Sequence, residues 1–296
     1  MEEKCNICPR KCNVDRKINK GYCGVSGNGI MAARAALHFW EEPCISGEKG
    51  SGTIFFSGCN LRCVYCQNYQ IAEASVKKEI TVEDLCRIFF ELKQKGANNI
   101  NLVTPTHYAA QISAAIKRAK AQGFDLPFVY NCSGYESVAT LKMLDGLIDV
   151  YLTDFKYMDS TLAGKYSHAS DYPDVAKAAL AEMYRQCPKP LFNSKDIMQK
   201  GVIVRHLLLP DCVQNAKDVV EYVYGLYGDD VFISLMSQYT PLKNVRNYPE
   251  LNRKITEDEY DELVDYALEL GIENAFVQEG DCAEESFIPC FDYEGL

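Results

Sequence analysis

Three closely spaced cysteines are the residues of this sequence best suited to carry chemistry. Cys59, Cys63 and Cys66 follow the short apolar run 53–56 with a CxxxCxxC spacing. Three thiolates on one loop can hold three irons of a 4Fe–4S cluster and leave the fourth iron without a protein ligand. A structural zinc site usually closes with four ligands, and an electron-transfer cluster needs a fourth nearby cysteine. The spacing therefore favours a cluster with one open iron over these two alternatives.

An open iron of this kind has a specific use. The carboxylate and amine of S-adenosylmethionine (SAM) can bind it, and an electron from the reduced cluster can cleave the sulfonium bond to give a 5′-deoxyadenosyl radical. SAM and Fe–S clusters are among the cofactors that carry radical chemistry for which side chains alone are unsuited. We therefore expect an anaerobic oxidoreductase that abstracts hydrogen and takes electrons from a reductant such as flavodoxin or ferredoxin.

A second group of cysteines lies near the amino terminus. Cys5, Cys8, Cys12 and Cys23 place four soft ligands in a compact segment, which can close a tetrahedral zinc site or hold an auxiliary Fe–S cluster. The spacing alone does not separate these two metals. The remaining cysteines are scattered, and we predict that they are small buried hydrophobic residues. They are Cys44, Cys86, Cys132, Cys187, Cys212, Cys282 and Cys290.

Alternating strand and helix patterns predict the elements that position these groups. Residues 1–50 are rich in Cys, Gly and Asn and are expected to form a small metal-stapled module with a lead-in segment. Residues 51–296 are expected to form an α/β domain, an open (partial) β/α barrel of about six parallel strands with an irregular tail. The strands are predicted at 53–56, 100–104, 127–132, 150–155, 201–209 and 231–236, with a seventh at 274–278.

Unusual polar residues follow these predicted strands. Functional groups of parallel α/β proteins gather at the carboxyl ends of the strands. The segments 104–107, 131–133, 154–156 and 205–206 occupy such positions, as does Cys59. His107 can act as an acid, a base or a substrate contact, although a lone histidine is more often structural. We expect these side chains to surround one site.

The cysteine motif resembles the signature of the radical SAM superfamily, in which an aromatic residue, here Tyr65, precedes the last cysteine. The segment SGCNLRCVYCQN at 57–68 resembles the branch that contains the pyruvate formate-lyase activating enzymes. CNICPRKC at 5–12, GYCG at 21–24, HFWEEP at 38–43 and TPTHY at 104–108 resemble a narrower group of activating-enzyme-like proteins. The resemblance covers almost the whole chain and implies the radical SAM fold, a 4Fe–4S cluster and SAM.

The resemblance also implies roles for individual residues around SAM. Tyr65 and Thr104 are expected to contact it, with Thr104 standing where activating enzymes have a Gly-Gly-Glu stretch. Asn131 and Ser133 occupy the position of the family's Asp-Thr-Asn-Gly turn, so an amide replaces the usual acid.

Two further strand ends complete this predicted shell. Asp154 and Lys156 resemble the family's Asp-Leu-Lys, and residues two apart in a strand face the same side. Arg205 lies in an apolar run and needs an anionic partner, for which the SAM carboxylate is the expected one.

Composition limits the partners. The net charge of −10 and pI near 5.0, without a Lys/Arg-rich run, disfavour nucleic acid. The sequence has no signal-peptide pattern or membrane span, so we expect a cytoplasmic protein.

Three functions remain open at this point. The chain is expected to activate a glycyl-radical or other protein partner. It is alternatively a radical SAM enzyme acting on a small molecule or peptide, or a non-enzymatic electron carrier or redox sensor.

Overall fold

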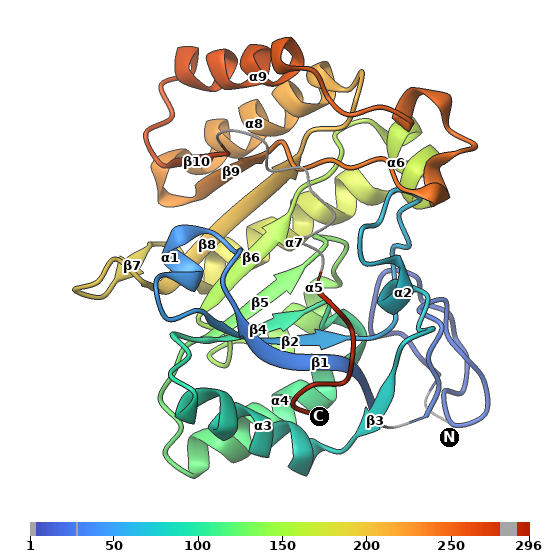
Figure 1. Ribbon diagram of the computed structural model, residues 1–296, viewed down its shortest axis with the longest axis vertical. Coiled ribbons are helices and arrows are strands. Elements are labelled where there is room, and N and C mark those ends of the chain that lie inside the picture. The colour runs from blue at the N-terminus through green and yellow to red at the C-terminus, as the bar shows by residue number, and fades with distance from the viewer. Residues whose placement is uncertain (1–3, 28, 279–288) are drawn as a thin grey trace.

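A computed structural model, which describes residues 4–27, 29–278 and 289–296, is built around one curved β-sheet (Figure 1). The strand order is β10-β9-β8-β6-β5-β4-β2-β1-β3, and β7 pairs with β8 beside this path. Seven neighbouring strands are parallel. They are β2 (Ser51–Phe56), β4 (Ile100–Val103), β5 (Phe128–Cys132), β6 (Val150–Asp154), β8 (Met198–Leu207), β9 (Phe232–Met236) and β10 (Ala275–Val277). The predicted partial β/α barrel, including its seventh strand, is confirmed.

Three antiparallel strands were not predicted. β1 (Ile30–His38) pairs with β2 and with β3 (Lys78–Ile80), so the segment predicted as a lead-in supplies a strand of the main sheet. β7 (Leu191–Phe192) forms a small hairpin with the start of β8. The carboxyl-terminal residues run across β1, where the Ala35 N–H donates to the Glu294 carbonyl at 2.8 Å (Figure 1).

Helices connect the parallel strands. Thr81 and Thr256 start two of them with capping boxes, because each hydroxyl accepts an N3 backbone N–H and the N3 carboxylate bonds back. The main helices are α3 (Val82–Gln94), α4 (Ala109–Ala121), α5 (Val138–Met143), α7 (Tyr172–Gln186), α8 (Val213–Tyr227) and α9 (Glu257–Glu269). Shorter ones are α1 (Pro43–Ser46), α2 (Tyr69–Ala72) and α6 (Ser160–Ser167). α6 lies between β6 and α7 and is capped by Asp159, whose carboxylate accepts the Thr161 and Leu162 N–H groups.

Successive side chains along a strand point to opposite faces of the sheet, and different elements cover the two faces. One face packs into the large core with the long helices, through residues such as Leu102, Tyr130 and Val204. On the other face, Val129, Leu152 and Ile203 pack against α1 at the amino ends of the strands. The same face continues toward the carboxyl ends at the next alternate positions. Because α1 covers this face only at the amino ends of the strands, the part of the face that α1 leaves uncovered lies at their carboxyl ends.

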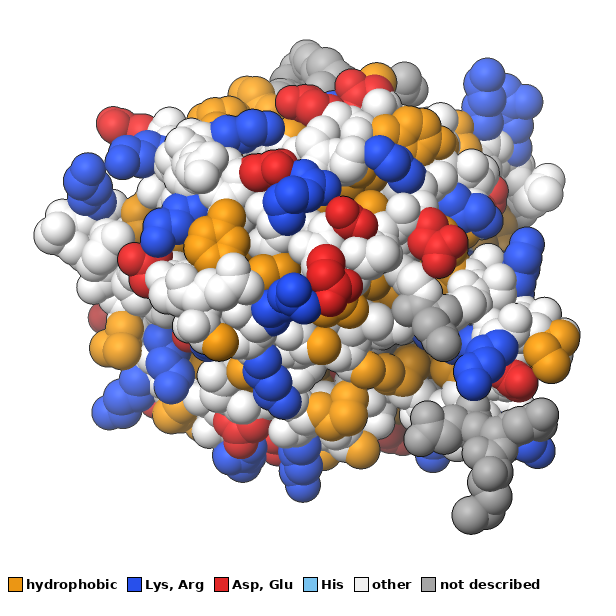
Figure 2. Space-filling model, turned by 90° about the horizontal axis from the view of Figure 1, so that it is seen from below, with side chains coloured by type: hydrophobic (Ala, Val, Ile, Leu, Met, Phe, Trp, Pro, Cys, Tyr) orange, Lys and Arg blue, Asp and Glu red, His pale blue; other side chains and the backbone are white. Residues whose placement is uncertain are grey.

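The surface on the side of α3 and α4 carries positive and negative side chains interspersed (Figure 2). Exposed pairs such as Arg87–Glu91 and Arg118–Glu83 account for part of this pattern. This face is therefore not a continuous basic surface. In the part of the chain that the structure describes, the helices are all too short or too polar to cross a membrane.

Candidate active site

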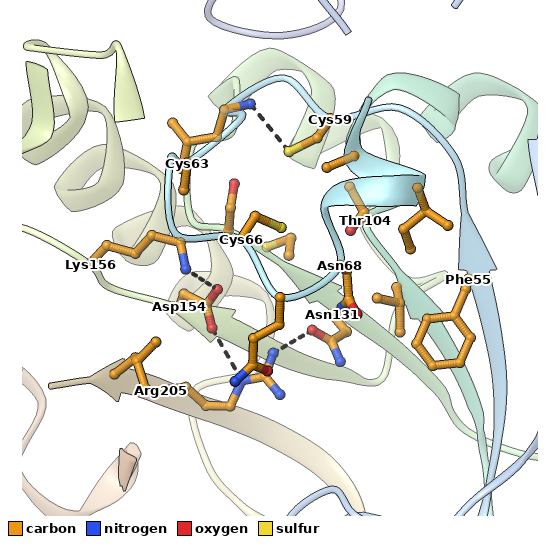
Figure 3. Close-up of a pocket in the computed structure, with 18 of the residues that line it drawn as sticks. Phe55, Cys59, Cys63, Cys66, Asn68, Thr104, Asn131, Asp154, Lys156 and Arg205 are labelled. Atoms are coloured by element: carbon orange, nitrogen blue, oxygen red, sulfur yellow. Dashed lines mark hydrogen bonds and ion pairs between the residues drawn. The ribbon is translucent and has the colours of Figure 1, made fainter. Parts of the chain in front are cut away.

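A cavity of about 260 Å³ lies at the carboxyl ends of the parallel strands (Figure 3). The alternate positions that follow the α1-covered residues form part of its wall, among them Asn131, Asp154 and Arg205. The loop after β2 supplies the cysteines of the CxxxCxxC motif. Ten residues predicted from the sequence thus border one cavity: Cys59, Cys63, Tyr65, Cys66, Thr104, Asn131, Ser133, Asp154, Lys156 and Arg205.

The cysteine loop turns sharply as it leaves β2. Gly58 has a φ of +93°, and a Cβ there would lie 2.7 Å from the Cys23 carbonyl oxygen, so the turn requires glycine. Arg62 adds a second left-handed residue, with φ at +57°. The Leu61 N–H donates to the Cys59 Sγ at 3.3 Å, and the Cys66 N–H donates to the Cys63 carbonyl at 3.1 Å. The backbone therefore folds around the sulfur atoms that it carries.

The three thiols of this loop are held in a desolvated environment. Burial raises the pKa of Cys59, Cys63 and Cys66, while the Lys156 ammonium opposes that rise. A metal that binds thiolates must displace these protons. Its own positive charge would compensate for the burial that keeps the free thiols neutral.

The donor set can be compared with what an iron–sulfur cluster needs. Among the described residues, no group of three or more Cys, His, Asp or Glu side chains surrounds a single-ion position. Ligands of a cubane lie further apart than ligands of one ion, because the cluster separates them. Three thiols that border one cavity supply the ligands of a cluster with one open iron, whereas a structural zinc site usually has four protein ligands.

A fourth cysteine also borders the cavity. Cys132 lies at the end of β5, and its Sγ donates to the Thr153 Oγ1 at 3.4 Å, within the sheet. Burial raises its pKa well above the usual value, with Glu136 adding to the effect. Cys132 thus belongs to β5 and not to the cysteine loop, and its thiol is engaged with the neighbouring strand. This arrangement fits a cluster with three cysteine ligands.

Two polar residues at the strand ends have features typical of a ligand contact. Thr104 has a φ of +59°, which is strained for a β-branched residue, and its N–H donates to the Asn131 carbonyl at 2.9 Å. The Ser133 Oγ is buried without a hydrogen-bond partner among the described residues. An unpaired buried hydroxyl is costly, so a bound ligand that supplies a partner would be favoured.

Asp154 and Lys156 form a partly buried ion pair on the cavity wall, with 2.7 Å between Nζ and Oδ2 (Figure 3). Burial alone would raise the pKa of Asp154, but Lys156 and Arg205 outweigh it and hold that pKa below its usual value. Burial would likewise lower the pKa of Lys156, but Asp154 and the Cys63 thiol outweigh it and raise that pKa. Both groups are therefore charged, and Lys156 places a positive charge near the cysteine loop.

Arg205 has protein partners for its charge. Its guanidinium contacts the Asp154 Oδ1 at 3.2 Å and the Glu41 Oε2 at 3.0 Å, and donates to the Asn131 Oδ1 at 2.5 Å (Figure 3). The sequence correctly indicated that a buried arginine needs an anion. Glu41 and Asp154 of the chain itself supply anionic partners, and a contact of Arg205 with the SAM carboxylate stays a prediction.

The residues after β1 contribute to the cavity and were not predicted as site residues. Glu41 accepts hydrogen bonds from Asn101 and Asn131 in addition to Arg205. Trp40, which is 65% exposed, borders the cavity opening. The only sequence signal for these residues was the HFWEEP segment, to which the resemblance gave no role. β1 pairs with β2, and this pairing brings the residues that follow β1 to the cavity.

His107 does not border the cavity. It is buried beneath the turn after β4, where its Nε2 lies 3.0 Å from the Ser57 carbonyl oxygen and its ring packs on Tyr108. Burial lowers its pKa to about 4, so it is neutral. The suggestion that His107 acts as an acid or base therefore has no geometric support, because its ring faces the protein interior.

The four amino-terminal cysteines lie in two turns. Lys11 and Asn13 adopt left-handed conformations, and the Lys11 N–H donates to the Cys8 carbonyl at 3.0 Å. The Tyr22 N–H donates to the Cys12 Sγ at 3.2 Å. Cys8 and Cys23 are buried, and burial raises the pKa of Cys8 to about 12. The four thiols are near neighbours, although they do not surround a single-ion position.

This amino-terminal segment contacts the cysteine loop directly. Arg10 donates from Nε to the Asn60 carbonyl at 2.7 Å and from Nη1 to the His168 carbonyl at 2.5 Å. Its guanidinium stacks on the Tyr22 ring, 4.0 Å from the ring centroid. Arg10 therefore links the amino-terminal turns, the cysteine loop and the end of α6.

The scattered cysteines are mostly core residues, as predicted. Among those described, all thirteen cysteines are free of disulfide bonds. Five of the scattered set are buried, namely Cys44, Cys86, Cys132, Cys187 and Cys212. Cys290 is exposed, so the prediction was wrong for it, and Cys282 lies outside the described residues.

Comparisons with known proteins agree with this architecture. Residues 53–187 match the model of the radical SAM superfamily. The uncharacterized protein MJ0674 of Methanocaldococcus jannaschii is 27% identical over 274 residues, covering 90% of this chain and 74% of that protein.

Two solved structures share the fold. SuiB of Streptococcus suis, bound to its precursor peptide SuiA, has a TM-score of 0.50 at 14% identity, covering 75% of this chain and 46% of SuiB. HydG, a maturase of the [FeFe]-hydrogenase, has a TM-score of 0.50 at 15% identity, covering 80% of this chain and 53% of HydG. This chain matches about half of each of these two proteins.

The family model thus matches the segment from β2 to the end of α7, which is a little under half of the chain. The likeness to the two solved structures, at such low identity, concerns the fold alone.

Proposed function

We propose that the chain is a radical SAM enzyme whose 4Fe–4S cluster is held by Cys59, Cys63 and Cys66, with SAM in the adjoining cavity. The observation that carries the proposal is the convergence of these three thiols and of strand-end polar groups on one cavity. When bound, the cluster and SAM supply reductive cleavage of the sulfonium bond and a 5′-deoxyadenosyl radical for hydrogen abstraction.

The protein's own residues bind and orient the cofactor in this proposal. Ser133 offers a buried hydroxyl that has no hydrogen-bond partner within the described part of the chain, and the strained turn at Thr104 offers backbone and hydroxyl acceptors for the SAM ammonium. Tyr65 lines the cavity beside the cysteines. Lys156 presents a positive charge to the SAM carboxylate while Asp154 fixes its position.

Arg205 acts one step further from the cofactor in this proposal. It contacts Asn131 and Asp154 directly and orients these two side chains toward the cavity, so it does not act as an isolated contact to SAM. Glu41 holds the other side of the guanidinium. The three strand ends thus form one connected polar wall.

SAM cleavage tests the proposal directly. Anaerobically reconstituted and reduced protein is expected to release 5′-deoxyadenosine from SAM, and the triple variant Cys59→Ala, Cys63→Ala, Cys66→Ala is expected to release none. Cys86→Ala, which removes a buried thiol of α3 that does not border the cavity, is the matched control and should retain cleavage. Cleavage that persists in the triple variant would refute the assignment of these ligands.

An experiment on the same reconstituted protein distinguishes the enzyme hypothesis from the electron-carrier hypothesis. A carrier or redox sensor would show reversible cluster reduction without binding SAM. Calorimetric titration of the reconstituted protein with SAM distinguishes the two, because only the enzyme is expected to give a saturable binding heat. The partnerless hydroxyl of Ser133 favours the enzyme.

We propose that the substrate is a glycine of a protein partner, as in an activating enzyme, with a small molecule or peptide as the alternative. Trp40 supports this proposal, since a large side chain exposed at the cavity opening suits contact with a macromolecule. Extract from cells grown on α-deuterated glycine can be divided into macromolecular and small-molecule fractions. Deuterium in 5′-deoxyadenosine is expected only with the macromolecular fraction. Label from the small-molecule fraction alone would instead support the alternative of a small-molecule substrate.

We also propose a second metal site at Cys5, Cys8, Cys12 and Cys23, within a module formed by the residues that precede β1. Four neighbouring thiols and an N–H donor to the Cys12 sulfur support it, whether the metal is zinc or an auxiliary Fe–S cluster. Zinc, iron and sulfide analysis of wild type and of the quadruple Cys→Ser variant tests it. Equal metal content in the two proteins would contradict the site.

A further inference from the structure

A chain of three buried hydroxyl groups ends at one cysteine of the motif. The Tyr65 and Tyr157 hydroxyl oxygens lie 2.8 Å apart, and the Tyr157 hydroxyl lies 2.9 Å from the Ser167 Oγ. Ser167 in turn donates to the Cys63 Sγ at 3.0 Å. Tyr157 and Ser167 are at most 1% exposed, and Tyr65 is 6% exposed. Water therefore has little access to this chain of hydrogen bonds.

The direction of every bond in this chain follows once Cys63 is a metal-bound thiolate. A thiolate carries no proton and can only accept, so the Ser167 hydroxyl must donate to it. A hydroxyl has one proton to donate, and Ser167 must then accept from Tyr157, which must accept from Tyr65. All three O–H dipoles point toward the sulfur, and hydrogen bonds aligned in this way polarise one another.

The position of Ser167 is fixed from outside the cavity. Ser167 is the last residue of α6, and the Val64 N–H donates to the neighbouring Tyr166 carbonyl at 2.8 Å. Arg10 donates to the Ser167 carbonyl at 3.2 Å and to the Asn60 carbonyl at 2.7 Å. The end of α6 and the cysteine loop are thus tied together on both sides of Cys63. Ser167 is therefore held in place by the fold, not by its bond to the sulfur.

We infer that Ser167 is a positioning residue that donates a hydrogen bond to the Cys63 thiolate and raises the reduction potential of the cluster, with Tyr157 orienting the serine hydroxyl. This inference rests on the proposed function. Hydrogen bonds to cluster sulfurs are among the factors that set the potential of Fe–S proteins. Reduction adds negative charge to the cluster and its thiolates, so a donor stabilises the reduced form more than the oxidised form.

The test is a redox titration of the anaerobically reconstituted protein. The electron paramagnetic resonance signal of the reduced cluster measures the reduced fraction at each potential. Ser167→Ala is expected to lower the ratio of reduced to oxidised cluster about tenfold at a fixed potential, a shift of about 59 mV for one electron. Tyr157→Phe should shift the midpoint in the same direction by a smaller amount, because Ser167 keeps its hydroxyl. Ser167→Thr, which retains a donor, should restore the wild-type midpoint.

Ser113→Ala is the matched control, since Ser113 is a buried serine of α4, a helix that packs against α3. It should leave the midpoint unchanged, and an equal shift in this control would overturn the inference. So would a wild-type midpoint in both Ser167→Ala and Tyr157→Phe. If Ser167→Ala fails to fold, Tyr157→Phe alone decides. Wild-type protein that binds no cluster would instead refute the proposed function, so the two failures are distinguishable.

Discussion

Replacing Arg205 by methionine should strongly destabilise the protein. The guanidinium is 13% exposed and contacts two carboxylates, those of Glu41 and Asp154, which are 9% and 21% exposed. Methionine fills a similar volume but leaves both carboxylates without their cation. Breaking a buried ion pair by removing one partner costs about 3–5 kcal/mol, and we expect a loss in the free energy of unfolding of this size.

An exposed arginine pair provides the comparison. Arg87 pairs with Glu91 across one turn of α3, and the two side chains are 50% and 43% exposed. Arg87→Met should cost only about 0.3–0.5 kcal/mol, because solvent screens the pair. Both variants are measured by urea unfolding under anaerobic conditions, followed by circular dichroism. A loss below about 1 kcal/mol for Arg205→Met would refute the argument from burial, because mutational losses of that size are ordinary.

The pH dependence gives an independent check through Asp154. In wild type the folded-state pKa of Asp154 lies below its ordinary value of 3.8, so its stabilising contribution is present above that pH and is lost as the pH falls through the lower folded-state pKa. Without Arg205 the folded-state pKa of Asp154 rises. The stability deficit of Arg205→Met should therefore shrink as the pH falls below about 4. A deficit independent of pH would contradict the role of Asp154.

Three further changes have definite expected outcomes. Cys132→Ser should retain the cluster and SAM cleavage, because three cysteines suffice as ligands; loss of the iron signal would show instead that Cys132 is a ligand. Gly134→Ala should cost more stability than Gly146→Ala, measured by urea unfolding, although both glycines have positive φ (+77° and +75°). A Cβ at Gly134 would lie 2.2 Å from the Asp154 carbonyl oxygen, whereas nothing lies within 4 Å at Gly146, and equal losses would contradict this contact. Burial raises the pKa of Glu136 from 4.5 to about 8. The stabilising contribution of Glu136 is therefore complete below its pKa in the unfolded chain and is lost as the pH rises through about 8. Glu136→Gln should lessen the fall in unfolding free energy between about pH 5 and pH 9, and an unchanged fall would contradict the assignment.

The sequence was sufficient to predict the fold class and ten of the residues that line the cavity. Parallel strands are buried on both faces, so 100–103 and 150–154 appear as apolar runs that end abruptly in polar residues. The antiparallel strand β1 escaped prediction, because Ile30–His38 resembles any apolar segment until its pairing with β2 is known. With β1 unplaced, Glu41 and Trp40 could not be assigned to the cavity.

The role of single side chains was harder to predict than their location. Thr104, Asn131 and Asp154 border the cavity because each follows the end of a parallel strand, a property of local sequence. His107 follows a strand end as well, but its side chain turns inward under Ser57. Local sequence indicates that a residue lies at a strand end, and packing decides which way its side chain points.

The sequence by itself determined the cysteine loop, since the three thiols lie within eight consecutive residues and their spacing is independent of the rest of the chain. It also determined that Arg205 needs an anion, because burying an isolated charge is too costly. Only the tertiary structure decided which side chains contact Arg205 and the cysteine loop. Glu41 lies 164 residues from Arg205, and Ser167 lies 104 residues from Cys63. Contacts over such separations depend on the order and register of the strands between them, which no local pattern contains.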